Sequence, residues 1–198
     1  MASLYFRHGV MGSGKSAALL QVVHNYTEKG LKCLLLQPRR GDKGQGKVIS
    51  RIGIERPIDY LITADSQIYN FIKHHMPDAV VVDEAQFLNP DQIDELYFVA
   101  KKLNIPVMAY GLRCDFQMKG FPGAMRLLSL ADHIEELKTI CKCGAKATHN
   151  MRLINDKPVF TGQQVALDGQ DNVTYESVCG ECYLKYMEES NDSRNTKS

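Results

Sequence analysis

The stretch GVMGSGKS, Gly9 to Ser16, has the G-x-x-x-x-G-K-S spacing of a phosphate-binding loop. It follows the apolar run Leu4 to Phe6 and precedes the helical-looking segment AALLQVVHNY. The expected order is strand, loop, helix, in which backbone N–H groups and the helix N-terminus bind phosphate oxygens. Lys15 would reach the β- and γ-phosphates, and the Ser16 hydroxyl would bind Mg²⁺. A glycine-rich turn that only caps a helix is the alternative, which the flanking elements disfavour.

A pair of carboxylates forms the second motif, AVVVDEAQF, in which four apolar residues directly precede Asp83 and Glu84. This context is typical of a Walker B strand, whose Asp83 would hold Mg²⁺ through water beside Ser16. A surface acidic turn is the alternative if the motif stands alone. Glu84 could activate water, as in motor ATPases and helicases, or an alcohol, as in a small-molecule kinase.

Four cysteines form the third motif, as the pairs Cys141 with Cys143 and Cys179 with Cys182. Two close thiolate pairs joined by a long loop suit tetrahedral Zn²⁺, which would stabilise a unit too small to fold by its core alone. Cysteines that merely pack are the alternative. Cys33 and Cys114 are interpreted as ordinary thiols, and His149 is not expected to be a ligand.

These groups need a framework, and the pattern up to about residue 137 supplies one. Apolar runs alternate with amphipathic segments, which predicts an α/β fold with a parallel sheet and covering helices. Gly30 should end the first helix, Ser66 should cap the second, and Asn89 or Asp91 should cap the third with Pro90 in its first turn. The predicted strands are Leu4 to Arg7, Cys33 to Gln37, Tyr60 to Thr63, Ala79 to Val82, Val107 to Tyr110 and His133 to Leu137.

Two segments are predicted to be loops. Residues 38 to 51 contain three glycines and five cations, and form either a solvated connector or a basic flap near the phosphates. Between the cysteine pairs, a hairpin turning at Asn155 and Asp156 should be followed by a Gly- and Asp-rich loop and a short strand. The expected domains are 1–137, the nucleotide-binding kinase domain, 138–187, a small zinc-binding β or lasso domain, and 188–198, a disordered tail.

Composition limits the remaining classes. With 198 residues, 44% apolar residues and a net charge of +1, the chain fits one medium domain with a small appendage and has no global field for nucleic acid or membranes. No apolar run approaches a membrane span of about 20 residues, and the N-terminus lacks a signal-peptide core. The expected location is cytoplasmic.

Five stretches together resemble one family over nearly the whole chain. These stretches, GVMGSGKS, VDEAQFL, PVMAYGLRCDF, ELKTIC and TYESVC, occur in the order found in the zinc-containing thymidine kinases of bacteria and the animal cytosol. The resemblance implies a P-loop, RecA-like kinase fold in which Glu84 takes the proton of the nucleoside 5′-hydroxyl. It also implies that Asp83 organises Mg²⁺ and that a loop called the lasso grips the pyrimidine.

The resemblance assigns further residues by position. The thymidine contacts implied are Met11, Phe87, Leu112, Phe116, Asn150 and Tyr175. The ATP and phosphate contacts implied are Gly9, Val10, Met11, Gly12, Ser13, Gly14, Lys15, Ser16, Asp83, Glu84, Ala85 and Gln86.

The chain departs from the family pattern at three places. Arg40-Gly41-Asp42 replaces an Asp-Asp-Arg-like run, which puts a carboxylate where the family has an Arg near the phosphates. Asp168-Gly169 replaces a Gly-Gly pair in a lasso about two residues longer, which bears on base specificity and loop closing. Gln117 follows Phe116, where many bacterial members have Arg and animal members share the Gln.

The sequence therefore predicts an ATP:thymidine 5′-phosphotransferase that makes thymidine monophosphate for nucleotide salvage, with structural Zn²⁺ and with Mg²⁺ bound with ATP. The family further implies a homotetramer and feedback by thymidine triphosphate, and neither nucleic acid nor a membrane is an expected partner. Two other classes stay open: a P-loop ATPase whose zinc module binds nucleic acid, and a catalytically weakened binding module. A two-domain helicase is disfavoured because no residues remain for a second RecA-like domain.

Overall fold

The computed structural model describes residues 1–39, 46–164 and 172–195, with side chains as far as Ser190. The contacts divide the chain into two units. The first comprises residues 1–8, 14–113 and 121–137, and the second comprises 9–13, 114–120 and 138–198. The phosphate-loop motif is thus divided, with Gly9 to Ser13 in the second unit and Gly14 to Ser16 in the first.

The first unit contains a six-stranded sheet in the order β5-β2-β6-β7-β1-β8. Every strand pairing in it is parallel, as the alternating pattern predicted. All four residues of the central strand β6 are fully buried, which explains its uninterrupted apolar sequence. The strands are β1 (Leu4–His8), β2 (Cys33–Pro38), β5 (Tyr60–Ile62), β6 (Ala79–Val82), β7 (Val107–Gly111) and β8 (His133–Glu136).

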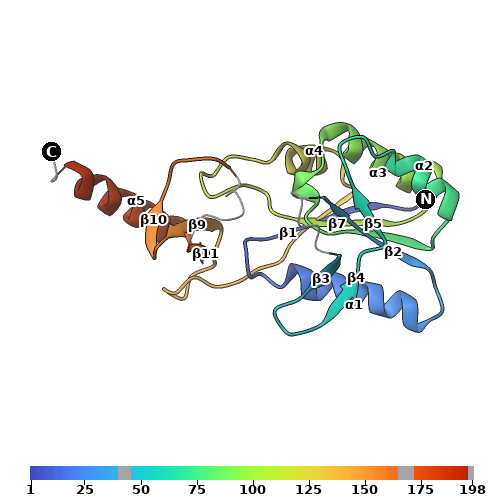
Figure 1. Cartoon of the computed structure of the whole chain (residues 1–198), viewed down its shortest axis with the longest axis horizontal. Coiled ribbons are helices and arrows are strands. Elements are labelled where there is room, and N and C mark those ends of the chain that lie inside the picture. Colours follow the sequence, from blue (N-terminus) through green and yellow to red (C-terminus); the bar gives the residue numbers. More distant parts are fainter. Residues whose placement is uncertain (40–45, 165–171, 196–198) are drawn as a thin grey trace. The chain divides into compact units, whose positions relative to one another are not determined.

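Helices cover both faces of this sheet. In Figure 1, α1 lies on one face, and α2, α3 and α4 lie on the other. The short 3₁₀ helix η1 follows β6 directly, so the acidic motif lies between a buried strand and a tight helical turn. The helices are α1 (Lys15–Glu28), α2 (Ile68–His75), η1 (Ala85–Phe87), α3 (Pro90–Lys102) and α4 (Pro122–Leu130).

The predicted helix boundaries are confirmed at two places and wrong at one. Gly30 has φ 74° and ends α1, where its N–H donates to the Thr27 carbonyl at 3.0 Å. Asn89 caps α3 in a reciprocal capping box with Gln92. Ser66 does not cap α2, because its hydroxyl accepts from the Thr63 N–H in the preceding turn.

The segment predicted as a loop between 38 and 51 contains a strand. Strand β3 (Lys47–Ile49) pairs antiparallel with β4 (Glu55–Pro57) in a separate two-stranded sheet. Only Val48 is buried in β3, so the short segment shows no apolar pattern that would have predicted a strand. Arg40-Gly41-Asp42 lies outside the described residues, as does Asp168-Gly169.

The second unit contains a three-stranded antiparallel sheet in the order β10-β9-β11. Its strands β9 (His149–Ile154) and β10 (Lys157–Val159) form the predicted hairpin. Asn155 and Asp156 make the turn in the left-handed region, with φ 49° and 59°. Strand β11 (Val173–Val178) completes the sheet and leads into α5 (Gly180–Asn195).

The tail from residue 188, which was expected to be disordered, is helical as far as Asn195, where α5 ends. Residues Leu184 to Glu189 of α5 have high helix propensity, which favours this extension.

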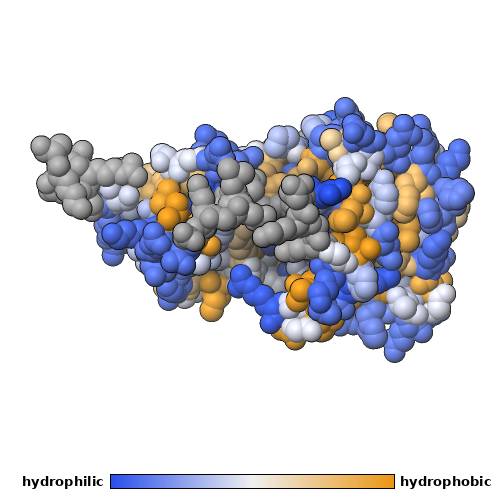
Figure 2. Space-filling view, in the orientation of Figure 1, coloured by the Kyte–Doolittle hydropathy of each residue, from blue (hydrophilic) through white to orange (hydrophobic). Residues whose placement is uncertain are grey.

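Hydrophilic side chains cover much of the face shown in Figure 2, with smaller hydrophobic patches between them. None of the described helices combines the length and the apolar character needed to cross a membrane.

Candidate functional site

The phosphate loop joins β1 to α1 through two glycines in the left-handed region. Gly12 has φ 75° and Gly14 has φ 82°. Gly14 precedes α1 without a side-chain cap, and the first turn carries no acidic residue. The Ser13 hydroxyl is buried and has no hydrogen-bond partner among the described residues. An uncapped helix start beside an orphaned donor suits an anion that accepts several hydrogen bonds.

Lys15, at the start of α1, lies in the electrostatic field of the two carboxylates after β6. Burial lowers the pKa of Lys15, while the negative charges of Glu84 and Asp83 raise it and Arg51 lowers it further. Burial, with Glu84 as a second cause, raises the pKa of Asp83 to about 7. Asp83 is 5% exposed. A buried carboxylate that resists ionisation in this way is a fitting partner for a cation, whose charge would stabilise the ionised form.

Glu84 has a backbone conformation unusual for its type. Its φ is 51° and its ψ is 35°, and its N–H donates to Asp83 Oδ1 at 3.0 Å. A non-glycine residue in the left-handed region costs about 1–2 kcal/mol of conformational free energy, and such positions are found disproportionately at functional sites. Its carboxylate accepts a hydrogen bond from the Gln86 side chain, so both backbone and side chain of Glu84 are held.

Gln86 links Glu84 to the end of the neighbouring strand. It is 1% exposed, and its Oε1 accepts from the Leu112 N–H at 3.0 Å. A Cβ at Gly111 would lie 2.4 Å from the same oxygen, so only glycine leaves room for this contact. Sequence reasoning placed Gln86 in an ATP-binding stretch and missed its contact with Leu112, 26 positions away.

Of the predicted thymidine contacts, two lie in the first unit. Phe87, in η1, packs edge-on against Phe121 with 5.4 Å between ring centroids. Leu112 is 6% exposed, and its N–H donates to the Gln86 side chain. The structure therefore brings Glu84, Gln86 and Leu112 together.

Met11 and Asn150 come together in the second unit. The Met11 N–H donates to Asn150 Oδ1 at 2.8 Å, and the Ser177 hydroxyl donates to the Met11 carbonyl. Asn150 and Ser177 are direct cross-strand partners in β9 and β11, so the two strands together hold both backbone polar groups of Met11. The Asn150 amide also donates weakly to the Cys114 carbonyl, at 3.5 Å. Its polar atoms are thus engaged with backbone groups.

Phe116 and Tyr175 both contact one side chain that sequence reasoning missed, that of Arg152. The Arg152 guanidinium carbon lies 3.6 Å from the Phe116 ring centroid, and Nε donates to the Tyr175 hydroxyl at 3.0 Å. The available signal was an arginine two positions after Asn150 in a predicted strand, because alternate residues of a strand lie on the same face.

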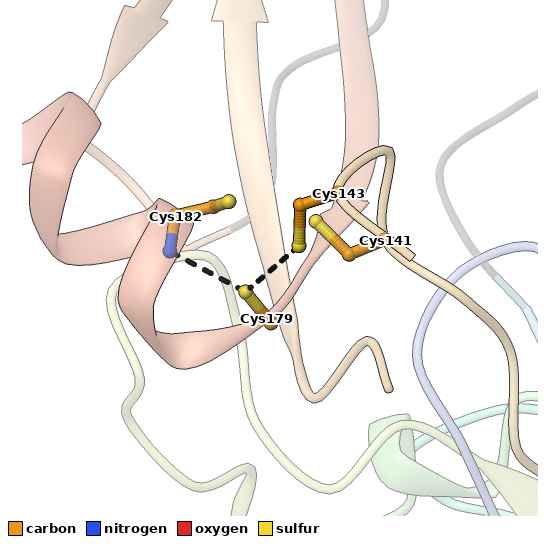
Figure 3. Close-up of side chains that lie close together, drawn as sticks. All are labelled: Cys141, Cys143, Cys179 and Cys182. Carbon is orange, nitrogen blue, oxygen red and sulfur yellow. Dashed lines mark hydrogen bonds between the residues drawn. The ribbon is translucent and has the colours of Figure 1, made fainter. Parts of the chain in front are cut away.

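The four predicted ligand cysteines converge in the second unit (Figure 3). Cys141 and Cys143 come from a tight turn before β9, while Cys179 directly precedes α5 and Cys182 lies in its first turn. The four sulfur atoms lie within 4.8 Å of one another, and Sγ of Cys143 is 3.6 Å from Sγ of Cys179. Tetrahedral ligands at the Zn–S distance would be about 3.8 Å apart. The cluster could therefore hold a metal ion.

The pKa values of the thiols also bear on metal binding. Hydrogen bonds from the backbone of Cys143 and Cys179 lower the pKa of Cys141 to about 7. Hydrogen bonds with the Cys179 and Cys143 thiols raise the pKa of Cys182 to about 12. A metal ion would bind these groups as thiolates and would release their protons.

The other predicted thiols and His149 lie outside this cluster. His149 contacts the Thr148 hydroxyl at 2.9 Å and packs against Tyr183. Cys33 is buried in β2, and burial raises its pKa to about 11. Neither residue belongs to the group of four cysteines.

A phosphate loop at a helix start, followed by a strand that ends in Asp and Glu, defines a P-loop nucleotide-binding protein. The model of one family, thymidine kinase, matches residues 2–183. The chain belongs to the thymidine kinase family, as the resemblance of its motifs indicated.

Individual relatives agree with this membership. The chain is 44% identical over 187 residues to a thymidine kinase of Chromobacterium violaceum, covering 92% of this chain and 98% of the relative. It is 45% identical over 185 residues to a thymidine kinase of Ruegeria pomeroyi, covering 90% and 92%. Among solved structures it is similar to the ATPase DotB of Legionella pneumophila, with a TM-score of 0.41, 16% identity and coverage of 94% of this chain and 48% of that one. That last likeness is too distant to carry an argument.

Proposed function

We propose that the protein transfers the γ-phosphoryl group of ATP to the 5′-hydroxyl of thymidine, giving thymidine monophosphate. The observation that carries this proposal is the fixed Glu84 carboxylate at the end of β6, next to buried Asp83 and within the field of Lys15. In a chain of the thymidine kinase family, such a carboxylate is suited to accept the proton of the attacking hydroxyl.

The roles of the phosphate-binding residues follow from their chemistry. Backbone N–H groups of Gly9 to Ser16 would hold the triphosphate, and Lys15 would neutralise the β- and γ-oxygens. Ala85 and Gln86 complete the proposed ATP-binding set. Ser16 and Asp83 would hold Mg²⁺, which supplies charge neutralisation for the transferred group. The chain itself contributes positioning, with Glu84 as the proton acceptor.

The proposed nucleoside contacts in the second unit are Met11, Phe116, Asn150 and Tyr175. The aromatic rings of Phe116 and Tyr175 suit a pyrimidine base, because flat apolar faces stack on it. Met11 is held at its backbone, which leaves its side chain available. Phe87 and Leu112 are the contacts proposed in the first unit.

The metal of the cysteine cluster is proposed to be structural zinc. Thiolate ligands favour Zn²⁺ over harder cations, and four protein ligands leave no open position for catalysis. We also propose that the enzyme acts in the cytoplasm, as a homotetramer with feedback inhibition by thymidine triphosphate, on the ground of its family membership. The proposed division is a kinase domain over 1–137 and a lasso domain over 138–187.

A label-transfer assay tests the reaction. The purified protein is incubated with Mg²⁺ and ATP labelled at the γ-phosphate, with thymidine, deoxyuridine, deoxycytidine or no nucleoside. Label should appear in thymidine, then in deoxyuridine, and not in deoxycytidine. ATP hydrolysis that is stimulated by single-stranded DNA and yields no labelled nucleoside would contradict the proposal and favour a nucleic-acid-dependent ATPase.

A further inference from the structure

Arg152 is a buried cation of the second unit with several polar and aromatic contacts. It lies on the central strand β9 and is only 4% exposed. No carboxylate forms an ion pair with it in the described part of the chain. A buried guanidinium without a counter-charge must be compensated by other polar contacts.

Neutral acceptors compensate it at both ends of the guanidinium fork. Nη1 donates to the Gln163 carbonyl at 2.8 Å, and Nη2 donates to the Gln164 carbonyl at 3.0 Å. Nε donates to the Tyr175 hydroxyl, across the β9–β11 pairing in which Arg152 and Tyr175 are direct partners. The planar fork thus joins two consecutive carbonyls after β10 to a side chain of β11.

The flat face of the guanidinium is used as well. Its central carbon lies 3.6 Å from the Phe116 ring centroid and 5.4 Å from that of Tyr175. Phe116 is itself fixed, because its carbonyl accepts from the Tyr183 hydroxyl at 2.7 Å. One side chain therefore sets the relative position of Phe116, Tyr175 and the peptide at 163–164.

We propose that Arg152 is a positioning residue that orients Phe116 and Tyr175 for the nucleoside. This role rests on the proposed function, in which both rings contact thymidine. Arg152 acts through those rings and through the backbone, so its loss should weaken nucleoside binding and leave ATP binding intact. Lysine cannot replace it, because an ammonium group has neither the fork nor the flat face.

The test compares Arg152→Lys and Arg152→Met with the wild type by steady-state kinetics. The KM for thymidine should rise about 10- to 100-fold in both variants, as expected for losing hydrogen bonds from a charged donor. The KM for ATP should change less than about twofold. Bound metal near one equivalent shows that the second unit is still folded. Arg126→Met, which removes a fork that pairs with Asp94 in the first unit, is the matched control and should leave both KM values unchanged.

A double-mutant cycle sharpens the test. If an Arg152 variant does not fold, the Tyr175→Phe variant still tests the contact by itself. Tyr175→Phe removes only the hydroxyl that accepts from Arg152 Nε, and its effect on the thymidine KM should be non-additive with that of Arg152→Lys. Additive effects, or an unchanged thymidine KM in Tyr175→Phe and Arg152→Lys, would overturn this role while the kinase assignment stands. A wild-type protein that phosphorylates no thymidine would overturn the proposed function and this role with it.

Discussion

The acidic end of β6 and the sheet of the second unit hold their candidate site residues in different ways. Asp83 and Glu84 follow a strand buried between parallel neighbours, so the sheet itself determines where they lie. Phe116 and Tyr175 are held by one arginine, and the cysteines by one another. The first region relies on main-chain topology, and the second relies on contacts between side chains, among them four cysteines that could hold a metal ion.

The size of the two cores explains this difference. The main cluster around α1 and β2 packs a broad set of aliphatic residues, including Leu19, Leu35 and Val81. Among the described residues of the second unit, one cluster packs seven buried residues, two of which are the cysteines Cys141 and Cys179. A core of that size needs a metal or strong polar contacts to hold one geometry. Changes in the second unit should therefore affect order more broadly, and changes in the first should affect single steps.

The largest effect is expected from Glu84→Gln. It removes the proposed proton acceptor and keeps the shape of the side chain, so kcat should fall about 10²- to 10⁴-fold while ATP binding persists. Steady-state kinetics and equilibrium ATP binding measure the two quantities. Glu135→Gln, which removes the exposed partner of Arg7, is the control and should keep kcat. Unchanged turnover in Glu84→Gln would remove Glu84 as the base.

Cys179→Ser should have the next largest effect, and it should act on the whole second unit. Loss of one thiolate should release about one equivalent of zinc, measured by metal analysis, and lower Tm by about 4 °C or more. The thymidine KM should rise more than the ATP KM. Cys114→Ser changes a cysteine of the same unit outside the cluster and should keep the metal. A wild-type protein that contains no zinc would contradict this prediction.

Gln86→Leu should misplace Glu84 and leave the Leu112 N–H without its acceptor. We expect kcat to fall about 10- to 100-fold and the free energy of unfolding to fall by about 1–3 kcal/mol. Gln92→Leu removes another buried glutamine of the first unit, which donates to the Thr63 carbonyl at 2.8 Å. It should cost similar stability in urea unfolding with no change in kcat. Equal losses of kcat in both variants would show that Gln86 has only a structural role.

The smallest effect is expected from Gly111→Ala. The added Cβ would meet Gln86 Oε1 at 2.4 Å, so the side chain must shift, which costs about 1–3 kcal/mol of stability. A modest fall in kcat should accompany the loss, seen by urea unfolding and steady-state kinetics. At Gly46 a Cβ meets nothing within 4 Å, so Gly46→Ala is the control and should change neither. Wild-type behaviour of Gly111→Ala would mean that Gln86 has room to move.

Much of the framework was predictable from local patterns. The parallel strands, the capping box at Asn89, the end of α1 at Gly30 and the hairpin turn at Asn155 each depend on neighbouring residues. The β3–β4 pair was not predictable, because only Val48 of β3 is buried and a strand of three residues shows no clear periodicity. The cap at Ser66 was wrong because a nearer turn uses its hydroxyl.

The sequence by itself determined the P-loop context, the acidic strand end, the two thiol pairs and the family, because each depends on residue types at short spacing. Only the tertiary structure decided that Gln86 joins Glu84 to Leu112, that Asn150 and Ser177 hold Met11, and that Arg152 lies on Phe116. These contacts join residues as many as 166 positions apart, so no local pattern specifies them. They form because buried polar groups must find partners wherever the folded chain places them.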